Sequence, residues 1–202
     1  MELTAWLSLA SICVLGAMTP GPSLAVILKH TVAGGRSHGL CASIAHGLAI
    51  ALYALLTVLG MALIITNTPW LFNIIKYAGA AFLLYLAYQA LTAKAGNDKL
   101  TINKETVTLW QSAQEGFLIA FLNPKIALFF IALFSQFIDI DANWPEKMLM
   151  VATVSGIDTL WYCLISVLLS QSSMLASLRK NSHIVDKITG VALLLVTARV
   201  LL

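Results

Sequence analysis

The stretch of sequence that decides the fold is residues 3–28, LTAWLSLASICVLGAMTPGPSLAVIL, which holds no charged side chain. It is long enough to cross a bilayer, because a transmembrane helix needs about 20 apolar residues. It also contains Thr19-Pro20-Gly21-Pro22, and proline inside a helix removes a hydrogen bond and kinks or breaks the helix. Unpaired backbone groups are so costly in lipid that a break at this depth is expected only beside protein or a water-filled cavity.

A second interruption, Asn123-Pro124-Lys125, falls inside another apolar segment, at a matching place in the second half of the chain. Thr and Asn are good N-cap residues, and Pro is favoured at the first helical position. Thr19-Pro20 and Asn123-Pro124 are therefore each interpreted as the cap and first residue of a new half-helix. Broken helices at corresponding positions of two repeats indicate the substrate site of a transporter, and an ordinary proline kink is the structural alternative.

The rest of the chain has the composition of a protein that crosses the bilayer several times. Hydrophobic residues make up 59% of it and charged residues 10%, against about 25% charged residues in soluble domains. The first segment lacks the basic n-region of a signal peptide and is longer than its h-region, so we expect it to be retained. We predict six spanning helices, near residues 4–28, 39–66, 70–91, 113–137, 148–170 and 184–202.

These helices are predicted to form one transmembrane transporter domain, residues 1–202, with a first half (1–91), a central polar loop (92–114) and a second half (115–202). Basic residues gather in the loops after the first, third and fifth spans, so the positive-inside rule places those loops in the cytoplasm. The net charge of +3 follows from this topology and does not indicate nucleic-acid binding. The predicted fold is all-α, with six transmembrane helices in two inverted three-helix repeats.

The two breaks offer groups that would bind an anion such as a carboxylate. The start of a helix carries partial positive charge and free N–H groups. Lys125 would lie deep in its span beside such a start, where a cation needs a substrate carboxylate or a buried acid; a lysine that snorkels or pairs structurally is the alternative. The predicted substrate-binding residues are Thr19, Pro20, Gly21, Pro22, Asn123, Pro124 and Lys125.

Asp158 lies in the middle of the fifth predicted span, where an aspartate costs about 2.5–3.5 kcal/mol on insertion scales. It should therefore be protonated, paired or exposed to water, which makes it a candidate for proton exchange; a purely structural hydrogen-bonding role is the alternative. The polar residues around it recur at the spacing of one helical face, a pattern typical of a wall that faces a cavity. These residues are Ser155, Asp158, Tyr162, Ser166 and Ser170.

His46, in the second predicted span, lies beside a stripe of small residues made of Gly39, Ser43 and Gly47. Such a stripe is typical of close helix packing, either within one chain or between two, which leaves a homo-oligomer open. A packed, hydrogen-bonded histidine is favoured over a proton relay, but His46 joins Asp158 as a candidate coupling residue.

Further motifs accompany the two breaks, namely Gly34-Gly35-Arg36 after the first span and KYAGAAFLLYL at residues 76–86 in the third. Taken together, this series resembles the LysE/RhtB family of amino-acid exporters, of the lysine, threonine and homoserine efflux type. The resemblance covers nearly the whole chain. It implies a multi-pass carrier of the bacterial inner membrane that exports amino acids or their analogues and is driven by the proton gradient.

The resemblance also carries roles to individual residues. It assigns the family's motif positions to residues 20–22 and 123–125, and it matches Asp158 with the membrane aspartate of the family's fifth span. The family's usual small residue in the middle of the second span is His46 here, a departure that is either local or tunes the substrate.

The sequence thus predicts a secondary active exporter working by proton antiport. A neutral amino acid is favoured over lysine or arginine because Asp158 is the only central acid. The alternatives are an intramembrane enzyme, although no H-E-x-x-H or C-x-x-C motif occurs, and a non-transporting membrane subunit. We expect no cofactor, no metal and no ATP-binding site; the expected partners are an amino acid, protons and the lipid bilayer.

Overall fold

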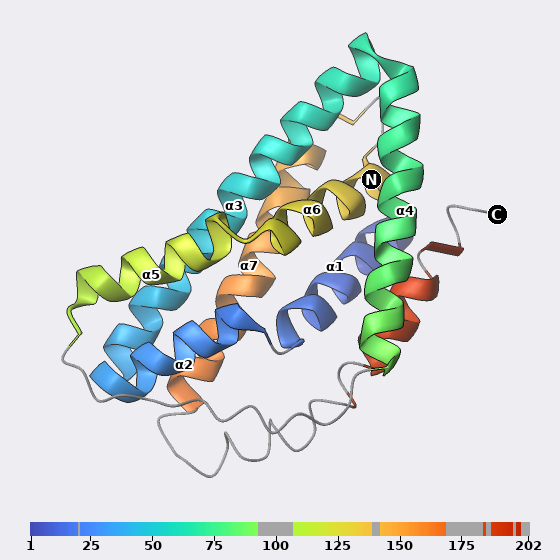
Figure 1. The fold of residues 1–202 in the computed structure, drawn as a ribbon. Coiled ribbons are helices and arrows are strands. Elements are labelled where there is room, and N and C mark those ends of the chain that lie inside the picture. The colour runs from blue at the N-terminus through green and yellow to red at the C-terminus, as the bar shows by residue number, and fades with distance from the viewer. Residues whose placement is uncertain are drawn as a thin grey trace.

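A computed structural model describes residues 1–19, 21–92, 107–138, 142–168, 184, 187–195 and 197–198, and every regular element within them is a helix. The predicted all-α class is therefore confirmed (Figure 1). Three helices are each long and apolar enough to cross a membrane: α3 (Arg36–Asn67), α4 (Pro69–Thr92) and α7 (Trp144–Leu168). Two bent pairs raise the candidate spans to five: α1 (Leu3–Met18) with α2 (Pro22–Gly34), and α5 (Leu109–Phe121) with α6 (Pro124–Phe137).

The two bent pairs coincide with the two interruptions in the sequence. The chain bends by 57° between α1 and α2 and by 54° between α5 and α6. These pairs occupy the places that the predicted inverted repeat requires, but the repeat itself stays a prediction. The sixth span also stays a prediction. Most of residues 169–202 lie outside the described part of the chain, although residues 187–195 are described and are helical.

At the first break the predicted cap is wrong. Thr19 ends α1 instead of starting α2: its backbone is extended, and its hydroxyl donates to the carbonyl of Leu15 at 2.9 Å. Gly21 is the N-cap of α2, and Pro22 is its first residue. The reason is that a residue before proline avoids the helical region, so Gly21 cannot continue a helix into Pro22, whereas Pro22 itself suits a first turn.

At the second break the predicted cap is correct. Asn123 is the N-cap of α6, and its side-chain oxygen accepts a hydrogen bond from the backbone N–H of Lys125 at 3.0 Å. Pro124 occupies the first turn. The helix before this break, α5, begins at Leu109 and therefore earlier than predicted, because Thr108 and Gln111 form a capping box. Residues 93–106, most of the predicted central loop, lie outside the described residues.

The long helix α3 forms the centre of the packing and contacts both α5 and α7. Small residues permit the close approach: a Cβ added at Gly116 would lie 2.8 Å from the carbonyl carbon of Ala42, and one added at Gly47 would lie 2.9 Å from the Cβ of Thr159. The small-residue stripe of α3 therefore packs within the chain. Figure 1 shows the result, with α2 and α5 together at one end of the molecule.

A second contact joins α2 to α7. Leu24 of α2 and Trp161 of α7 both pack against a small buried cluster that includes Ile27 and Tyr162. Because Tyr162 follows Asp158 by one helical turn, this contact ties the start of α2 to the central part of α7.

Candidate functional site

A cavity of about 350 Å³ lies where the two breaks meet the centre of α7. Cavities of this size are at the lower end of the range for small-molecule sites. Its wall is drawn from both halves of the sequence, since α1, α2, α3 and α4 contribute to it as well as α6 and α7. The cavity therefore exists only when the two halves are packed together.

Most of the predicted site residues line this cavity. From the first break they are Thr19, Gly21 and Pro22; from the second, Asn123 and Lys125. The two candidate coupling residues, His46 of α3 and Asp158 of α7, line it too. Pro124 is not part of this wall and instead borders a neighbouring groove, and Pro20 lies outside the described residues.

Asp158 and His46 form a hydrogen-bonded pair, with the Nδ1 of His46 2.7 Å from Asp158 Oδ2. The side chain of His46 is 1% exposed and that of Asp158 is 14% exposed. The ring of Tyr162 meets the imidazole edge-on, with ring centroids 4.9 Å apart. Of the three states expected for an aspartate at this depth, pairing is thus the one found.

Lys125 lies at the mouth of the cavity and is exposed in the isolated chain. Within the described residues, no carboxylate lies at ion-pair distance from its ammonium group, so the expectation of a buried acid beside Lys125 finds no support there. The ammonium is accordingly available to a group that enters the cavity. Also at the cavity wall, the hydroxyl of Thr19 lies 3.2 Å from that of Thr189, from the C-terminal part of the chain.

Most of the remaining cavity wall is apolar, although Ser23, Gln89 and Tyr162 also line it. Side chains from four helices and the C-terminal part form a surface that would accept a branched hydrocarbon chain but has no partner for a second charged group. These residues are Ile50, Leu86, Ile126, Phe129, Phe130, Val154 and Leu193.

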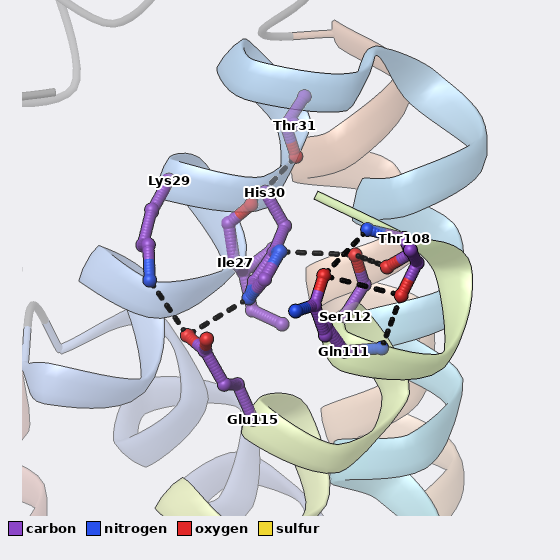
Figure 2. Close-up of polar contacts among 8 residues, drawn as sticks. All are labelled: Ile27, Lys29, His30, Thr31, Thr108, Gln111, Ser112 and Glu115. Carbon is purple, nitrogen blue, oxygen red and sulfur yellow. Dashed lines mark hydrogen bonds and ion pairs between the residues drawn. The ribbon is translucent and has the colours of Figure 1, made fainter. Parts of the chain in front are cut away.

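A separate polar cluster joins α2 to α5 and is absent from the sequence-based predictions (Figure 2). Glu115 accepts from Lys29 at 2.9 Å and lies 3.1 Å from the Nε2 of His30. The Nδ1 of His30 is 2.9 Å from the hydroxyl of Ser112, and the His30 side chain is fully buried. The opposite charges of Lys29 and Glu115, at one predicted membrane face, were the available signal in the sequence.

The family model described as "LysE type translocator" matches residues 14–202 of the chain. The chain is also similar to a leucine efflux protein of Klebsiella pneumoniae, with 29% identity over 160 residues that cover 77% of this chain and 73% of that protein. A leucine efflux protein of Salmonella typhimurium is 29% identical over 152 residues, which are 75% of this chain and 71% of the relative.

A third relative is similar over a greater length. The uncharacterized membrane protein YrhP of Bacillus subtilis is 23% identical over 201 residues, which cover 95% of this chain and 94% of YrhP. No solved structure matches the chain.

Proposed function

Because the chain belongs to the family of LysE type translocators, we propose that it exports a neutral, leucine-like amino acid across the bacterial inner membrane in exchange for protons. Membership makes it a multi-pass membrane transporter and not an enzyme. The finer claims, namely the substrate, its position and the coupling, rest on the cavity. The observation that carries them is that one cavity joins both helix breaks to the Asp158–His46 pair.

The two ends of a zwitterionic amino acid have complementary groups in this cavity. The carboxylate would lie between the starts of α2 and α6, where partial positive charge and the ammonium of Lys125 favour an anion. The substrate ammonium would lie against the carboxylate of Asp158, which lines the same cavity. Both termini of the substrate are then paired, which a desolvated charge requires.

The side chain of the substrate would lie against the apolar wall. Full burial of a leucine side chain is worth about 1.5–3 kcal/mol, whereas a lysine ammonium there would find no second acid within the described residues. The names of the Klebsiella and Salmonella relatives, both leucine efflux proteins, favour the same class. Outward transport would be driven by proton entry, with the Asp158–His46 pair as the site at which ammonium is exchanged for a proton.

Efflux from cells tests this proposal. Cells that express the chain are loaded with a panel of dipeptides, and the amino acids that leave are measured with and without an uncoupler. We expect faster, uncoupler-sensitive loss of leucine-like amino acids, which Asp158→Asn abolishes. Ser155→Ala is the matched control: Ser155 lies one turn from Asp158 but, contrary to the predicted polar face, it does not line the cavity, and it donates to the carbonyl of Val151. No excess efflux of any amino acid would contradict the proposal.

The position of the carboxylate can be tested with a substrate that lacks it. Lys125→Gln removes the cation at the cavity mouth, and hydrogen bonds to charged groups contribute about 1.5–3 kcal/mol. Inhibition of leucine transport by leucine and by leucinamide is compared in both proteins. We expect the substitution to weaken inhibition by leucine by about 10- to 100-fold, which is the equivalent of that energy. Inhibition by leucinamide should be unchanged. Equal losses for both would place the carboxylate elsewhere.

A further inference from the structure

His46 is placed so that it shares the Asp158 carboxylate with whatever occupies the cavity. Its Nδ1 lies 2.7 Å from Asp158 Oδ2. An ionised carboxylate only accepts hydrogen bonds, so Nδ1 carries the hydrogen and donates it. In the neutral ring the lone pair is then on Nε2. This atom is buried and has no hydrogen-bond partner among the residues that the structure describes.

An unpartnered nitrogen on a buried ring is unusual, because nearly all buried polar atoms in folded proteins have a partner. The position of His46 is not an accident of loose packing. Gly47, the next residue, brings α3 against Thr159 of α7, and the Tyr162 ring holds the imidazole from the side. The fold therefore fixes an imidazole that is hydrogen-bonded through one nitrogen and has no partner for the other among the described residues.

From this geometry we propose that His46 carries the coupling proton, and that the proton and the substrate ammonium occupy the His46–Asp158 pair in turn. This inference rests on the proposed function. With His46 neutral, the pair has one negative charge and can hold an ammonium. With a proton on Nε2 the pair has no net charge, and the ammonium loses its counter-ion.

The other titratable groups of the described cavity wall do not supply a second negative charge, so the charge that faces the ammonium is set by the His46–Asp158 pair. Cys13 of α1 and Tyr162 of α7 line the cavity with uncharged side chains at neutral pH, and Lys125 of α6 supplies the one further charge of the described cavity wall. The positive charge of Lys125 adds to the repulsion of an ammonium once His46 is protonated, and it is neutralised by the substrate carboxylate when the substrate is bound.

The exchange balances in protons and charge. On the outer side, Nε2 takes a proton from water and the substrate leaves with its ammonium intact. On the inner side, Nε2 returns that proton to water and the next ammonium binds Asp158. One proton thus enters for each amino acid that leaves, and the only bonds exchanged are the Nε2–H bond of His46 and an O–H bond of water.

Histidine suits this role because a neutral imidazole has one nitrogen that donates a hydrogen bond and a second that can take up a proton. His46→Gln keeps a donor beside Asp158 but removes the imidazole proton site. The ammonium site would persist, whereas the proton site on Nε2 would be lost. A role in packing alone would not separate the two properties.

The test uses purified full-length protein in liposomes, with leucine as the probe. Exchange of labelled leucine at equal pH is measured beside leucine movement driven by a pH gradient. For His46→Gln we expect exchange to be kept and gradient-driven movement to be lost, whereas Asp158→Asn loses both and Ser155→Ala loses neither. Retained gradient-driven movement in His46→Gln would overturn the inference, and so would loss of exchange by a folded variant.

The wild-type protein supplies a second measurement that does not depend on the variant folding. Lowering the pH equally on both sides of the membrane should weaken the affinity for leucine that exchange measures, by up to tenfold per pH unit. The maximal rate of exchange should not change. A leucine affinity that is independent of pH between 5 and 8 would overturn the inference. Absence of any amino-acid exchange by wild type would instead contradict the proposed function.

Discussion

At the scale of single residues, Asn123 has two roles, because it both stabilises a helix and lines the cavity. Its side chain caps α6 by accepting from the N–H of Lys125, and it also lines the cavity. A second asparagine performs the capping role alone: the Asn143 side chain accepts from the N–H of Glu146 at the start of α7, away from the cavity. The two residues thus separate structural from functional effects.

Alanine at either position is expected to cost about 1 kcal/mol of stability, as loss of an N-cap does in other helices. Thermal unfolding in detergent should show similar decreases in Tm for Asn123→Ala and Asn143→Ala. Only Asn123→Ala should also weaken leucine transport, because only that change disturbs the start of α6 in the cavity. Equal transport by the two variants would show that the second break does not bind substrate.

The sequence predicted the cap at Asn123 but not the one at Gly21. Both predictions used the same rule, a capping residue followed by proline, and Asn123-Pro124 obeys it. The first break contains two prolines, so two helix starts compete, and the start at Pro22 prevails because Thr19 bonds back to Leu15. Rules for one residue and its neighbour cannot decide between overlapping matches to the same pattern.

At the scale of elements, α2 and α5 are joined by the cluster around Glu115 (Figure 2). The two partners of Glu115 differ in burial: the Lys29 side chain is 42% exposed and that of His30 is fully buried. Exposed ion pairs contribute about 0–1 kcal/mol, while an unsatisfied buried group costs about 1–3 kcal/mol. The histidine should therefore matter more to stability than the formally charged lysine.

We expect Lys29→Ala to leave the unfolding temperature nearly unchanged and His30→Ala to lower it clearly. The second change opens a cavity and leaves Ser112 without its side-chain partner. Thermal unfolding of the two purified variants under identical detergent conditions checks this order. The reverse order would mean that the ion pair, and not the buried histidine, holds α2 to α5.

Close backbone contact between α3 and α5 makes a further prediction. Gly116→Ala would press a methyl group into the Ala42 backbone, which cannot move aside as a side chain can, and overpacking of this kind costs about 1–3 kcal/mol. Gly60→Ala is the matched control, because nothing lies within 4 Å of the added carbon. Unfolding should occur at lower temperature for Gly116→Ala, while Gly60→Ala should be neutral or stabilising.

Contacts between elements were the part that the sequence could not supply. The apolar runs predicted the all-α class and marked the interrupted segments, and the periodicity of α7 predicted a polar face around Asp158. Pairing of Asp158 with His46, however, joins residues 112 positions apart. The pairing depends on the relative axial position of α3 and α7, which pack closely at Gly47 and Thr159, and a local sequence pattern does not determine that position.

At the scale of the whole molecule, the cavity is bounded by both halves of the chain. A substrate held there would contact both breaks at once and bind only the folded protein. Ligands of that kind stabilise by mass action, by about 2.7 kcal/mol at a concentration one hundred times the Kd. We expect leucine to raise the unfolding temperature in a concentration-dependent way, with no such effect in Asp158→Asn; a rise of equal size in that variant would contradict binding at this cavity.

Because Trp161 packs against α2, its fluorescence can report a change in the position of that helix. Indole emission responds to the polarity around the ring, and Trp161 packs beside the same buried cluster as Leu24, only a few residues from the break before α2. Any tilt of α2 away from α7 would admit water or lipid to this ring. A form of the chain that keeps Trp161 and has phenylalanine at its other tryptophans would therefore show, by its emission wavelength, when the first broken span changes shape.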